Sequence, residues 1–455
     1  MIVEIKREDF GRILKIRIRG KDLITPHFFP VVKPGYKISR EPSTENIFSD
    51  AVITSAYLLR KAKNRKTLRE IFDYDGIIMT DSGAYQALLY RESLPITPEE
   101  IVEYQKFIDS DIAVILDEPV LPEDSEAEAM RKAEETLKRA REANIDKERA
   151  RVMPIHGVGK IRVLKHMLSQ ADFERYSIAA LGGVVPYMDR YDYAPVVEAT
   201  IIARDMLPSR IPLHVFGAGH PTLIPFLVAA GADTFDSASF ALYARDNRYL
   251  TPWGTFYLDE LEELPCSCPI CFSRDPDELK RDKRLLEIHN YLTLYYEIVR
   301  VREAIRLGRL WEYLERKART HPAAMDALRV LIKYRDLIRH RTPRIRNRGM
   351  FVYDELSLQR PDAPEVPEVR IEEEYEIVYE PPLRELEKYD KRVYYLSIRG
   401  LIPGELSETY PFAQTEAPRY LKEKLRREHE KKYKDRVSSE THEDRGCSSL
   451  REFFS

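Results

Sequence analysis

Cysteine is scarce in this chain, with four residues in 455, and three of them fall within six positions. So few thiols exclude a disulfide framework, and their clustering indicates a metal site. Long hydrophobic runs are also absent, because no stretch approaches the roughly 18 apolar residues that a membrane-spanning helix needs. The N-terminal stretch carries acids where a signal or transit peptide would be apolar or acid-poor. We therefore expect a cytoplasmic protein with no membrane partner.

An excess of charge of one sign is missing as well. Lys and Arg number 73 against 76 Asp and Glu, which gives a formal net charge of −3. This balance excludes a positive electrostatic field over the whole chain, so any nucleic acid must bind to a local basic patch. Aromatic residues are plentiful by contrast, with 27 Tyr and 17 Phe in a hydrophobic content of 43%. Such a chain can build a large core, and its length predicts one large domain with appendages.

Eight short apolar runs precede residue 241, separated mostly by amphipathic, helix-favouring stretches. Strands that are buried on both faces have unbroken apolar sequences, and eight strand–helix units can close into a (β/α)8 TIM barrel. The expected fold class is therefore α/β with such a barrel, and an open doubly wound sheet is the alternative. The runs cover 25–32, 51–58, 76–83, 111–119, 150–157, 176–184, 211–219 and 233–240.

Three aspartates end apolar runs of the expected barrel. Asp81 ends the third run, Asp117 the fourth and Asp236 the eighth. A single aspartate at such a place most often caps the following helix or turn. Reactive groups of barrel enzymes lie at the C-terminal ends of the strands, however, and paired carboxylates serve glycosyl and proton-transfer chemistry. The three aspartates therefore indicate a site at the barrel mouth, although many sugar and base enzymes share this pattern.

Glycines end the sixth and seventh runs, as Gly182-Gly183 and as Gly217-Ala218-Gly219. Without a Cβ, the backbone there can contact a flat ligand or a phosphate, although a tight strand-to-helix turn explains the glycines equally well. No G-x-G-x-x-G follows a first strand, so a dinucleotide fingerprint is absent.

The most specific local motif is Cys266-Ser267-Cys268-Pro269-Ile270-Cys271. Three thiolates at this spacing need a fourth soft ligand to complete tetrahedral zinc, and His289 is the best candidate. Four protein ligands leave no open position, so we expect one structural Zn²⁺. The alternative for His289 is an ordinary surface position on a helix. Cys447 is expected to be an unpaired thiol.

One segment concentrates positive charge. Residues 329–348 hold eight Lys or Arg against one Asp, with Tyr334 and His340 interleaved. Such a segment can follow phosphates, whereas a merely solvated helix face normally interleaves acids. The candidate RNA-binding residues are Arg335, Arg339, Arg341, Arg344, Arg346 and Arg348.

Helical spacing of apolar residues over 285–340 and a Pro/Glu-rich composition over 360–385 suggest how the chain is divided. Helices are also expected at 97–108, which begins with a capping box and a first-turn proline, and at 124–144. We expect a TIM-barrel catalytic domain over 1–250, a zinc-binding and helical subdomain over 251–345, an extended Pro/Glu-rich arm over 346–418, and a charged, partly disordered tail over 419–455.

Taken together, these motifs resemble the tRNA-guanine transglycosylases of the archaeal, archaeosine-forming type. The resemblance covers about residues 1–345, and a weaker similarity follows at 409–417. It is carried by Gly11-Arg12-Ile13, Thr25-Pro26, TDSGAYQ (80–86), LDEPV (116–120), LGGVVP (181–186), HVFGAGHP (214–221), FDSASFALYARDNRYLTPWGT (235–255) and CSCPIC (266–271).

The resemblance implies a reaction and roles for matching residues. Such enzymes exchange the guanine at tRNA position 15 for the 7-deazaguanine base preQ0 through a covalent aspartyl–ribose intermediate. Asp236 would attack C1′ of the ribose, Asp81 would handle the proton of the leaving and incoming bases, and Asp117 would recognise the Watson–Crick edge of the base. Ser82, Gly182, Gly183 and Val184 would line the base slot.

The sequence departs from the family at three places. His156 stands where a glutamine usually contacts the base, and Glu118 adds a carboxylate after Asp117. C-terminal modules such as the PUA domain have no counterpart, so either a separate PUA-type RNA-binding protein is a partner or the basic segment 329–348 suffices. A homodimer is a further expectation. Alternatives to the tRNA enzyme are a DNA-directed 7-deazaguanine transglycosylase and a non-catalytic tRNA-binding paralogue, although retention of Asp81 and Asp236 argues against the latter.

Overall fold

Eight parallel strands form a nearly closed barrel at the centre of this computed structural model. Each of the eight apolar runs contributes one strand, so the predicted TIM barrel is confirmed. The strands are β4 (His27–Pro30), β7 (Ala51–Ser55), β8 (Ile77–Asp81), β9 (Ile112–Val114), β10 (Ala150–Ile155), β11 (Ile178–Leu181), β12 (Leu213–Val215) and β13 (Thr234–Ser237). The structure describes residues 2–6, 10–85, 96–144, 148–343, 348–363, 375–378, 392–398, 400–406 and 415–433.

The order of the strands fixes which side chains can meet. Hydrogen-bonded neighbours follow the order β4-β13-β12-β11-β10-β9-β8-β7, and a bridge between Val31 and Ile53 joins the two ends. Strands β12 and β13 are thus neighbours, as are β9 and β10. Strands β4 and β7 separate β13 from β8. Because all eight strands run in parallel, their C-terminal ends gather at one mouth.

A small antiparallel sheet packs onto the apolar interior of the barrel. It consists of β1 (Ile2–Lys6), β2 (Ile13–Ile18) and β3 (Lys21–Ile24). Leu14 and Ile16 of this sheet share one buried cluster with Ala51 and Ile77, which begin barrel strands. The N-terminal sheet therefore covers the N-terminal end of the barrel and leaves the C-terminal end for chemistry.

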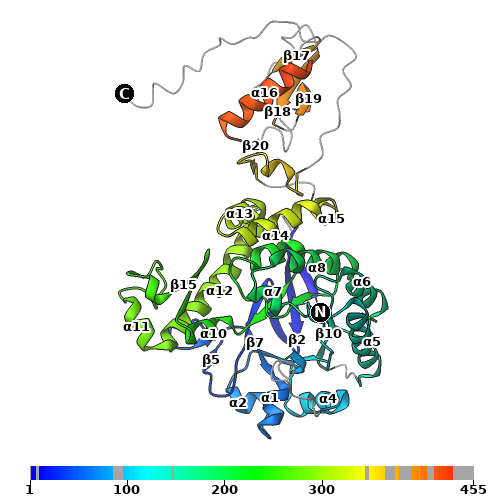
Figure 1. Cartoon of the computed structure of the whole chain (residues 1–455), viewed down its shortest axis with the longest axis vertical. Helices are drawn as coiled ribbons and strands as arrows, with labels where there is room; N and C mark the ends of the chain where they lie inside the picture. Colours follow the sequence, from blue (N-terminus) through cyan, green and yellow to red (C-terminus); the bar gives the residue numbers. More distant parts are fainter. Residues whose placement is uncertain are drawn as a thin grey trace. The chain divides into compact units, whose positions relative to one another are not determined.

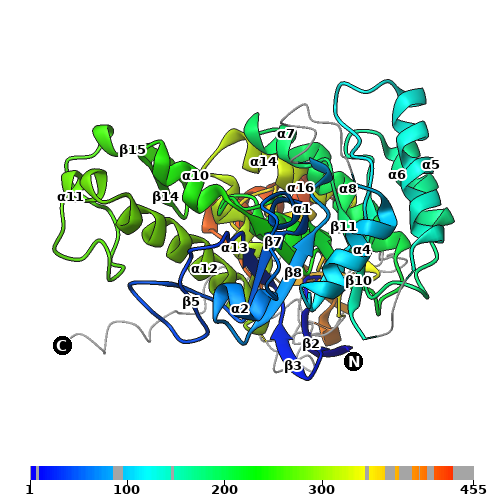
Figure 2. The same cartoon turned by 90° about the horizontal axis from the view of Figure 1, so that it is seen from below.

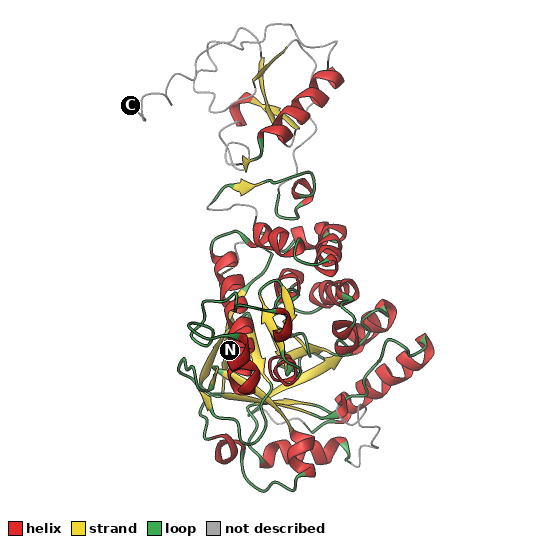
Figure 3. Ribbon diagram, turned by 60° about the vertical axis from the view of Figure 1, so that its left-hand side comes forward, coloured by secondary structure: helices red, strands yellow, loops and turns green. Residues whose placement is uncertain are grey.

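Helices surround the barrel on the outside (Figure 3). The capping box that the sequence predicts at Thr97 is present, with Glu100 bonded back to the Thr97 backbone, and the second predicted helix begins after Ser125. These helices are α1 (Ala56–Lys61), α2 (Leu68–Phe72), α4 (Pro98–Phe107), α5 (Glu126–Glu142), α6 (Ile161–Gln170), α7 (Val185–Asp189), α8 (Tyr193–Met206), α9 (Ile224–Ala230) and α10 (Ser239–Arg245).

A hairpin and a helical group follow the barrel without separating from it. The hairpin and α11 lie on the side of the barrel opposite α5 and α6 (Figures 1 and 2). The long helix α12 packs against α9 and α10, so residues 1–344 form one compact unit without a division at residue 250. The elements are β14 (Arg248–Thr251), β15 (Gly254–Tyr257), α11 (Pro276–Arg281), α12 (Lys283–Arg306), α13 (Leu310–Ala318), α14 (Pro322–Lys333) and α15 (Arg335–Arg339).

Residues 345–455 form a second compact unit. Its described part differs from the extended arm expected over 346–418, because Val393, Tyr394 and Ile402 are buried in a small sheet. The strand Arg392–Ser397 is rich in aromatic and β-branched residues, which favour a half-buried sheet. The elements are β16 (Met350–Phe351), β17 (Tyr375–Val378), β18 (Arg392–Ser397), β19 (Gly400–Pro403), β20 (Thr415–Glu416) and α16 (Arg419–Tyr433).

Two sequence expectations fall partly or wholly outside this description. Residues 434–455, which hold Cys447, and residues 409–414 lie outside the described residues. Within the part of the chain that the structure describes, no helix is long and apolar enough to cross a membrane.

Candidate functional site

The three aspartates singled out from the sequence all stand where barrel strands end. Asp81 is the last residue of β8, Asp236 lies in β13 one residue before its end, and Asp117 follows β9 by three residues. The barrel therefore brings them to the same mouth from three different strands. Asp236 is 8% exposed, so its carboxylate needs partners that replace water.

The partners of Asp236 come from the neighbouring strand β12 and from the loop that follows it. His214 Nε2 lies 2.9 Å from Asp236 Oδ1, and the backbone N–H of Gly217 donates to the same oxygen at 3.2 Å. His214 Nδ1 lies 2.9 Å from the hydroxyl oxygen of Thr234. A carboxylate can only accept, so Nε2 carries the proton, and the Thr234 hydroxyl donates to Nδ1. The carboxylate and the imidazole are thus each held by two hydrogen bonds, one of which they share.

Sequence reasoning missed His214. A signal was nevertheless present, because His214 sits inside the seventh apolar run at the place that corresponds to Thr234 in the eighth. In parallel neighbours, residues in register point to the same face of the sheet, and side chains two positions apart on one strand do so too. Once the runs are aligned as neighbouring strands, His214, Thr234 and Asp236 therefore share one face.

Asp117 has partners from two other strand ends. The Ser82 hydroxyl donates to Asp117 Oδ1 at 3.1 Å, and His156 Nε2 donates to Oδ2 at 2.9 Å. His156 is 1% exposed, and its Nδ1 has no hydrogen-bond partner among the described residues. The structure thus brings together Ser82, Asp117 and His156, three of the predicted base-recognition residues.

Gly182 and Gly183 are required by this arrangement. A Cβ on Gly182 would lie 2.6 Å from Cε1 and 2.9 Å from Nδ1 of His156, so the imidazole occupies the space of a side chain. Gly183 has φ +74°, and a Cβ there would lie 2.5 Å from the carbonyl oxygen of Val120. Only glycine fits both positions without a shift of the neighbours. Val184 follows as a buried residue before α7.

Glu118 does not add a carboxylate to the pocket, contrary to the sequence expectation. Its carboxylate accepts from Arg131 at 2.6 Å and lies 3.8 Å from Arg139, and both arginines belong to α5. Asp117 instead bonds to Ser82 and His156, so the two neighbouring carboxylates have different partners. Glu118 therefore ties the segment after β9 to the outer helix.

His220 lies four residues beyond Phe216 on the loop after β12. Burial lowers its pKa to about 3, and the nearby charges of Lys317 and Arg248 act in the same direction. Its Nδ1 accepts the backbone N–H of Thr222 at 3.3 Å. His220 is therefore neutral at physiological pH and is unsuited to act as a proton donor there.

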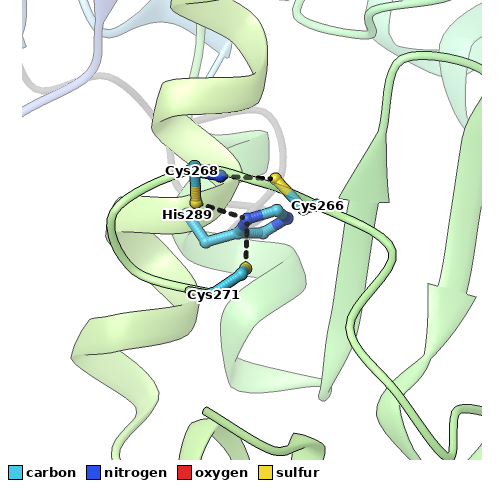
Figure 4. Close-up of side chains that lie close together, drawn as sticks. All are labelled: Cys266, Cys268, Cys271 and His289. Atoms are coloured by element: carbon cyan, nitrogen blue, oxygen red, sulfur yellow. Dashed lines mark hydrogen bonds between the residues drawn. The ribbon is translucent and has the colours of Figure 1, made fainter. Parts of the chain in front are cut away.

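The cysteine cluster and His289 form the second candidate centre. The ligand atoms of Cys266, Cys268, Cys271 and His289 lie within 4.8 Å of one another, where the loop that precedes α11 faces helix α12 (Figure 4). His289 Nδ1 lies 3.5 Å from Cys268 Sγ and 3.2 Å from Cys271 Sγ. The surface alternative for His289 is wrong, because the side chain is buried. Such a cluster can bind a metal.

Partners outside the cluster orient its ligands. His289 Nε2 donates to the carbonyl oxygen of Leu250 at 2.9 Å, which leaves the lone pair of Nδ1 directed at the thiols. The Tyr249 ring stacks on the imidazole at 3.9 Å between centroids, and its hydroxyl donates to Cys271 Sγ at 3.2 Å. A histidine held by a carbonyl and a thiolate held by a donor are the surroundings that metal ligands usually have. The donor set therefore fits a four-coordinate soft or borderline metal ion.

The basic segment 329–348 is partly neutralised. Lys333 pairs with Glu198 at 2.8 Å, and Arg339 lies 3.6 Å from Asp336. Arg341 donates to the carbonyl oxygen of Ala230 at 3.4 Å. Arg335 is exposed on α15, and Arg348 is exposed in the second unit. Arg344 and Arg346 lie outside the described residues.

Comparison with known proteins gives the family. The family model described as Queuine tRNA-ribosyltransferase matches residues 8–323, which include the barrel and the metal cluster. The chain belongs to this family of glycosyltransferase-type enzymes.

Curated relatives carry a more specific name, tRNA-guanine(15) transglycosylase. The relative from Sulfolobus acidocaldarius is 34% identical over 97% of this chain and 93% of its own length. The relative from Saccharolobus solfataricus is 38% identical over 93% of this chain and 92% of its own length. The relative from Pyrococcus abyssi is 36% identical, and the match covers 91% of this chain and 70% of that protein.

Proposed function

We propose that this chain is a tRNA-guanine(15) transglycosylase that exchanges guanine for preQ0 in archaeosine synthesis. The observation that carries the proposal is the carboxylate of Asp236, which is held at the barrel mouth by His214 and the Gly217 N–H while Asp81 ends a second strand at the same mouth. Comparison with known proteins supports the proposal, because relatives that match nearly the whole chain carry the name tRNA-guanine(15) transglycosylase.

The proposed reaction consists of two displacements at C1′ of the ribose. In the first, an oxygen of Asp236 forms a bond to C1′ while the bond from C1′ to N9 of guanine breaks, and the electron pair leaves on N9. Asp81 supplies the proton that neutralises the base. In the second, Asp81 takes a proton from the incoming base, whose nitrogen attacks C1′ and releases Asp236. Two displacements retain the stereochemistry, and one glycosidic bond replaces another, so no ATP is needed.

The base slot is proposed to lie at the ends of β8 to β11. Asp117 accepts from the Watson–Crick edge of the base, and its geometry is fixed by Ser82 and His156. A carboxylate with both oxygens held in place discriminates strongly, because a base without matching donors would leave it unpaired. Gly182, Gly183 and Val184 complete the slot with a backbone surface on which a flat ring can lie.

We propose that the metal is zinc, one ion per chain, bound by Cys266, Cys268, Cys271 and His289. Three thiolates and one imidazole are a common ligand set for structural zinc. The four protein ligands leave no position for substrate, so the metal joins the loop after β15 to α12 and stays outside the reaction.

The proposed nucleic-acid partner is tRNA, met in part by the arginines of 329–348. Arg335, which lies 3.9 Å from Asp336, and Arg348 are exposed, and Lys333 is paired with Glu198. Two further partners stay predictions: a separately encoded PUA-type RNA-binding protein and a second copy of this chain. Sedimentation of the chain alone and with tRNA measures whether it forms a dimer.

The test of the proposed function uses base exchange and the covalent adduct. The chain is incubated with labelled guanine and either tRNA or duplex DNA, and retention of label by tRNA alone is expected. Asp236→Asn should abolish both exchange and any denaturation-resistant enzyme–tRNA adduct while tRNA binding changes little. Asp81→Asn should abolish exchange but still allow Asp236 to form the adduct.

Three results would contradict the proposal. Label in DNA instead of tRNA would favour the DNA-directed reaction. Binding of tRNA without any exchange would favour the non-catalytic paralogue. An Asp236→Asn variant that still exchanges bases would remove Asp236 from the mechanism.

A further inference from the structure

His214 is buried at the barrel mouth with a hydrogen-bond partner on each nitrogen, and the two proposed displacements give it no role. It lies in the middle of β12 and is 1% exposed. The rings of Phe29 and Phe216 contact its imidazole edge to face, at centroid distances of 5.8 and 4.8 Å. The imidazole is therefore confined by packing, and its two nitrogens point in fixed directions.

Both nitrogens of His214 have partners, and the partners determine the tautomer. The Thr234 hydroxyl at Nδ1 makes that nitrogen the acceptor, so the proton is on Nε2 and is donated to Asp236 Oδ1. Thr234 and Asp236 are two residues apart on β13, and His214 is in register with Thr234 on β12. The sheet itself thus builds a chain of hydrogen bonds from hydroxyl to imidazole to carboxylate.

We propose that His214 is a positioning residue for the nucleophile Asp236, with Thr234 selecting its tautomer. This inference rests on the proposed function, because it assigns the orientation of the attacking carboxylate. The donors from His214 and Gly217 both bind Oδ1. Together they stop rotation of the carboxylate, so that Oδ2 keeps its lone pairs for C1′. His214 keeps its proton throughout both displacements.

Two opposing contributions decide whether loss of the His214 donor speeds or slows the attack of Asp236 on C1′. Hydrogen bonds to a carboxylate stabilise its charge and make it a weaker nucleophile, which slows attack. Fixing the attacking oxygen against C1′ speeds attack, and misplacement by about 1 Å can cost ~10²-fold in rate. Since the donors bind the oxygen that does not attack, we expect orientation to dominate and loss of the His214 donor to slow adduct formation.

Two isosteric substitutions separate the donor from the bulk of the ring. The amide nitrogen of His214→Gln reaches the place of Nε2 and keeps the donor to Asp236, whereas the shorter side chain of His214→Asn reaches only the place of Nδ1 and keeps the contact to Thr234. Both variants are neutral and polar. Single-turnover formation of the covalent enzyme–tRNA adduct should slow about 100-fold in His214→Asn and only a few-fold in His214→Gln. The tRNA dissociation constant should be the same in both.

A second pair of variants tests the tautomer without removing the ring. Thr234→Val removes the hydroxyl but keeps the shape, and Thr234→Ser keeps the hydroxyl. Adduct formation should slow about tenfold in Thr234→Val, because Nδ1 then competes for the proton, and should be preserved in Thr234→Ser. Thermal unfolding of all four variants shows whether each retains the fold. If His214→Asn does not fold, the comparison of Thr234→Val with Thr234→Ser tests the positioning role of His214.

The outcomes distinguish this inference from the proposed function. Equal adduct rates in His214→Asn and His214→Gln, or a loss confined to tRNA binding, would overturn the positioning role. A wild-type chain that forms no adduct with tRNA, tested beside Asp236→Asn, would instead overturn the proposed function itself.

Discussion

Two histidines at the barrel mouth hold two aspartates, and they differ in how completely they are satisfied. His214 has a partner on each nitrogen. His156 donates to Asp117 from Nε2, but its buried Nδ1 has no partner among the described residues. A buried acceptor without a partner costs about 1–3 kcal/mol unless a ligand or water satisfies it. At the scale of single residues, His156 is thus the position most sensitive to what fills the base slot.

The first prediction concerns base selection by His156. His156→Gln should keep base exchange within about tenfold, because an amide can replace the donor to Asp117. The amide carries its donor and its acceptor on one group, whereas the imidazole carries them on different edges of the ring. The ratio of kcat/KM for preQ0 over guanine should therefore differ between the wild type and His156→Gln. Steady-state exchange with each base measures both ratios.

His156→Leu is the matched control, since it keeps the volume but leaves Asp117 Oδ2 without this donor. It should raise KM for the base more than it lowers kcat. If the wild type and His156→Gln gave the same ratio, His156 would not influence selection of the base.

At the scale of elements, the metal cluster explains how a loop with little regular structure is fixed. The segment between β15 and α11 is irregular apart from one short 3-10 turn at Leu258–Glu260, yet Cys268 and Cys271 are buried against α12. Cys266 lines a cavity of about 180 Å³ together with Trp253 and Tyr296. The proposed metal would thus hold this loop against α12 in place of a larger hydrophobic core.

The second prediction is that removal of the metal lowers stability without changing the chemistry at the barrel mouth. Elemental analysis should find about one zinc per chain. Cys268→Ser should lower the thermal midpoint by about 5 °C or more, because the loss of a few kcal/mol shifts a chain of this size by several degrees. Adduct formation at a temperature well below the midpoint should change only a few-fold. Ser267→Ala, which leaves the four ligands in place, is the control.

Protein that is purified without chelator and contains no metal would contradict the assignment. So would a Cys268→Ser variant with unchanged stability.

The third prediction concerns the basic segment. Replacing Arg344, Arg346 and Arg348 with Ala should weaken tRNA binding and reduce the slope of log K against log salt by ~0.7–0.9 for each lost phosphate contact. Lys333→Ala is the control, because this charge is already paired with Glu198 and should change the slope little. Filter binding at several salt concentrations gives the slopes. An unchanged slope in the triple variant would place the phosphate contacts elsewhere on the chain.

At the scale of the whole molecule, buried histidines make stability depend on pH. His220 is buried, and its pKa is lowered to about 3, whereas histidine in the unfolded chain titrates near 6.5. Below that value the unfolded chain binds a proton that the folded chain does not. The contribution of His220 is therefore complete above pH ~6.5 and is lost as the pH falls towards 3, by at most about 1.4 kcal/mol per pH unit.

The fourth prediction concerns the loss of stability that His220 causes as the pH falls. His220→Asn keeps an acceptor for the Thr222 N–H but cannot titrate, so its free energy of unfolding should fall less steeply than that of the wild type between pH 6.5 and 4. His340→Asn, at an exposed position directly after α15, should follow the wild type. Urea unfolding at a series of pH values measures the slopes, and parallel curves for wild type and His220→Asn would show that His220 does not contribute.

The sequence by itself determined the barrel and the four residues of the candidate metal centre. Strands that are buried on both faces must be short unbroken apolar runs, so β4 and β7 to β13 could be located without coordinates. The end of each run also located Asp81 and Asp236. The three cysteines needed only local spacing, because ligands on one loop are brought together by the loop itself.

Only the tertiary structure decided which side chains meet across strands. The contact of His214 with Asp236, and that of His156 with Asp117, join residues 22 and 39 positions apart and depend on strand order and register. Glu118 pairs with Arg131 because α5 lies beside the segment after β9, which no local pattern reveals. The strands of the second unit were missed for a related reason, since a small sheet is stabilised mainly by packing against distant segments and only weakly by local propensity.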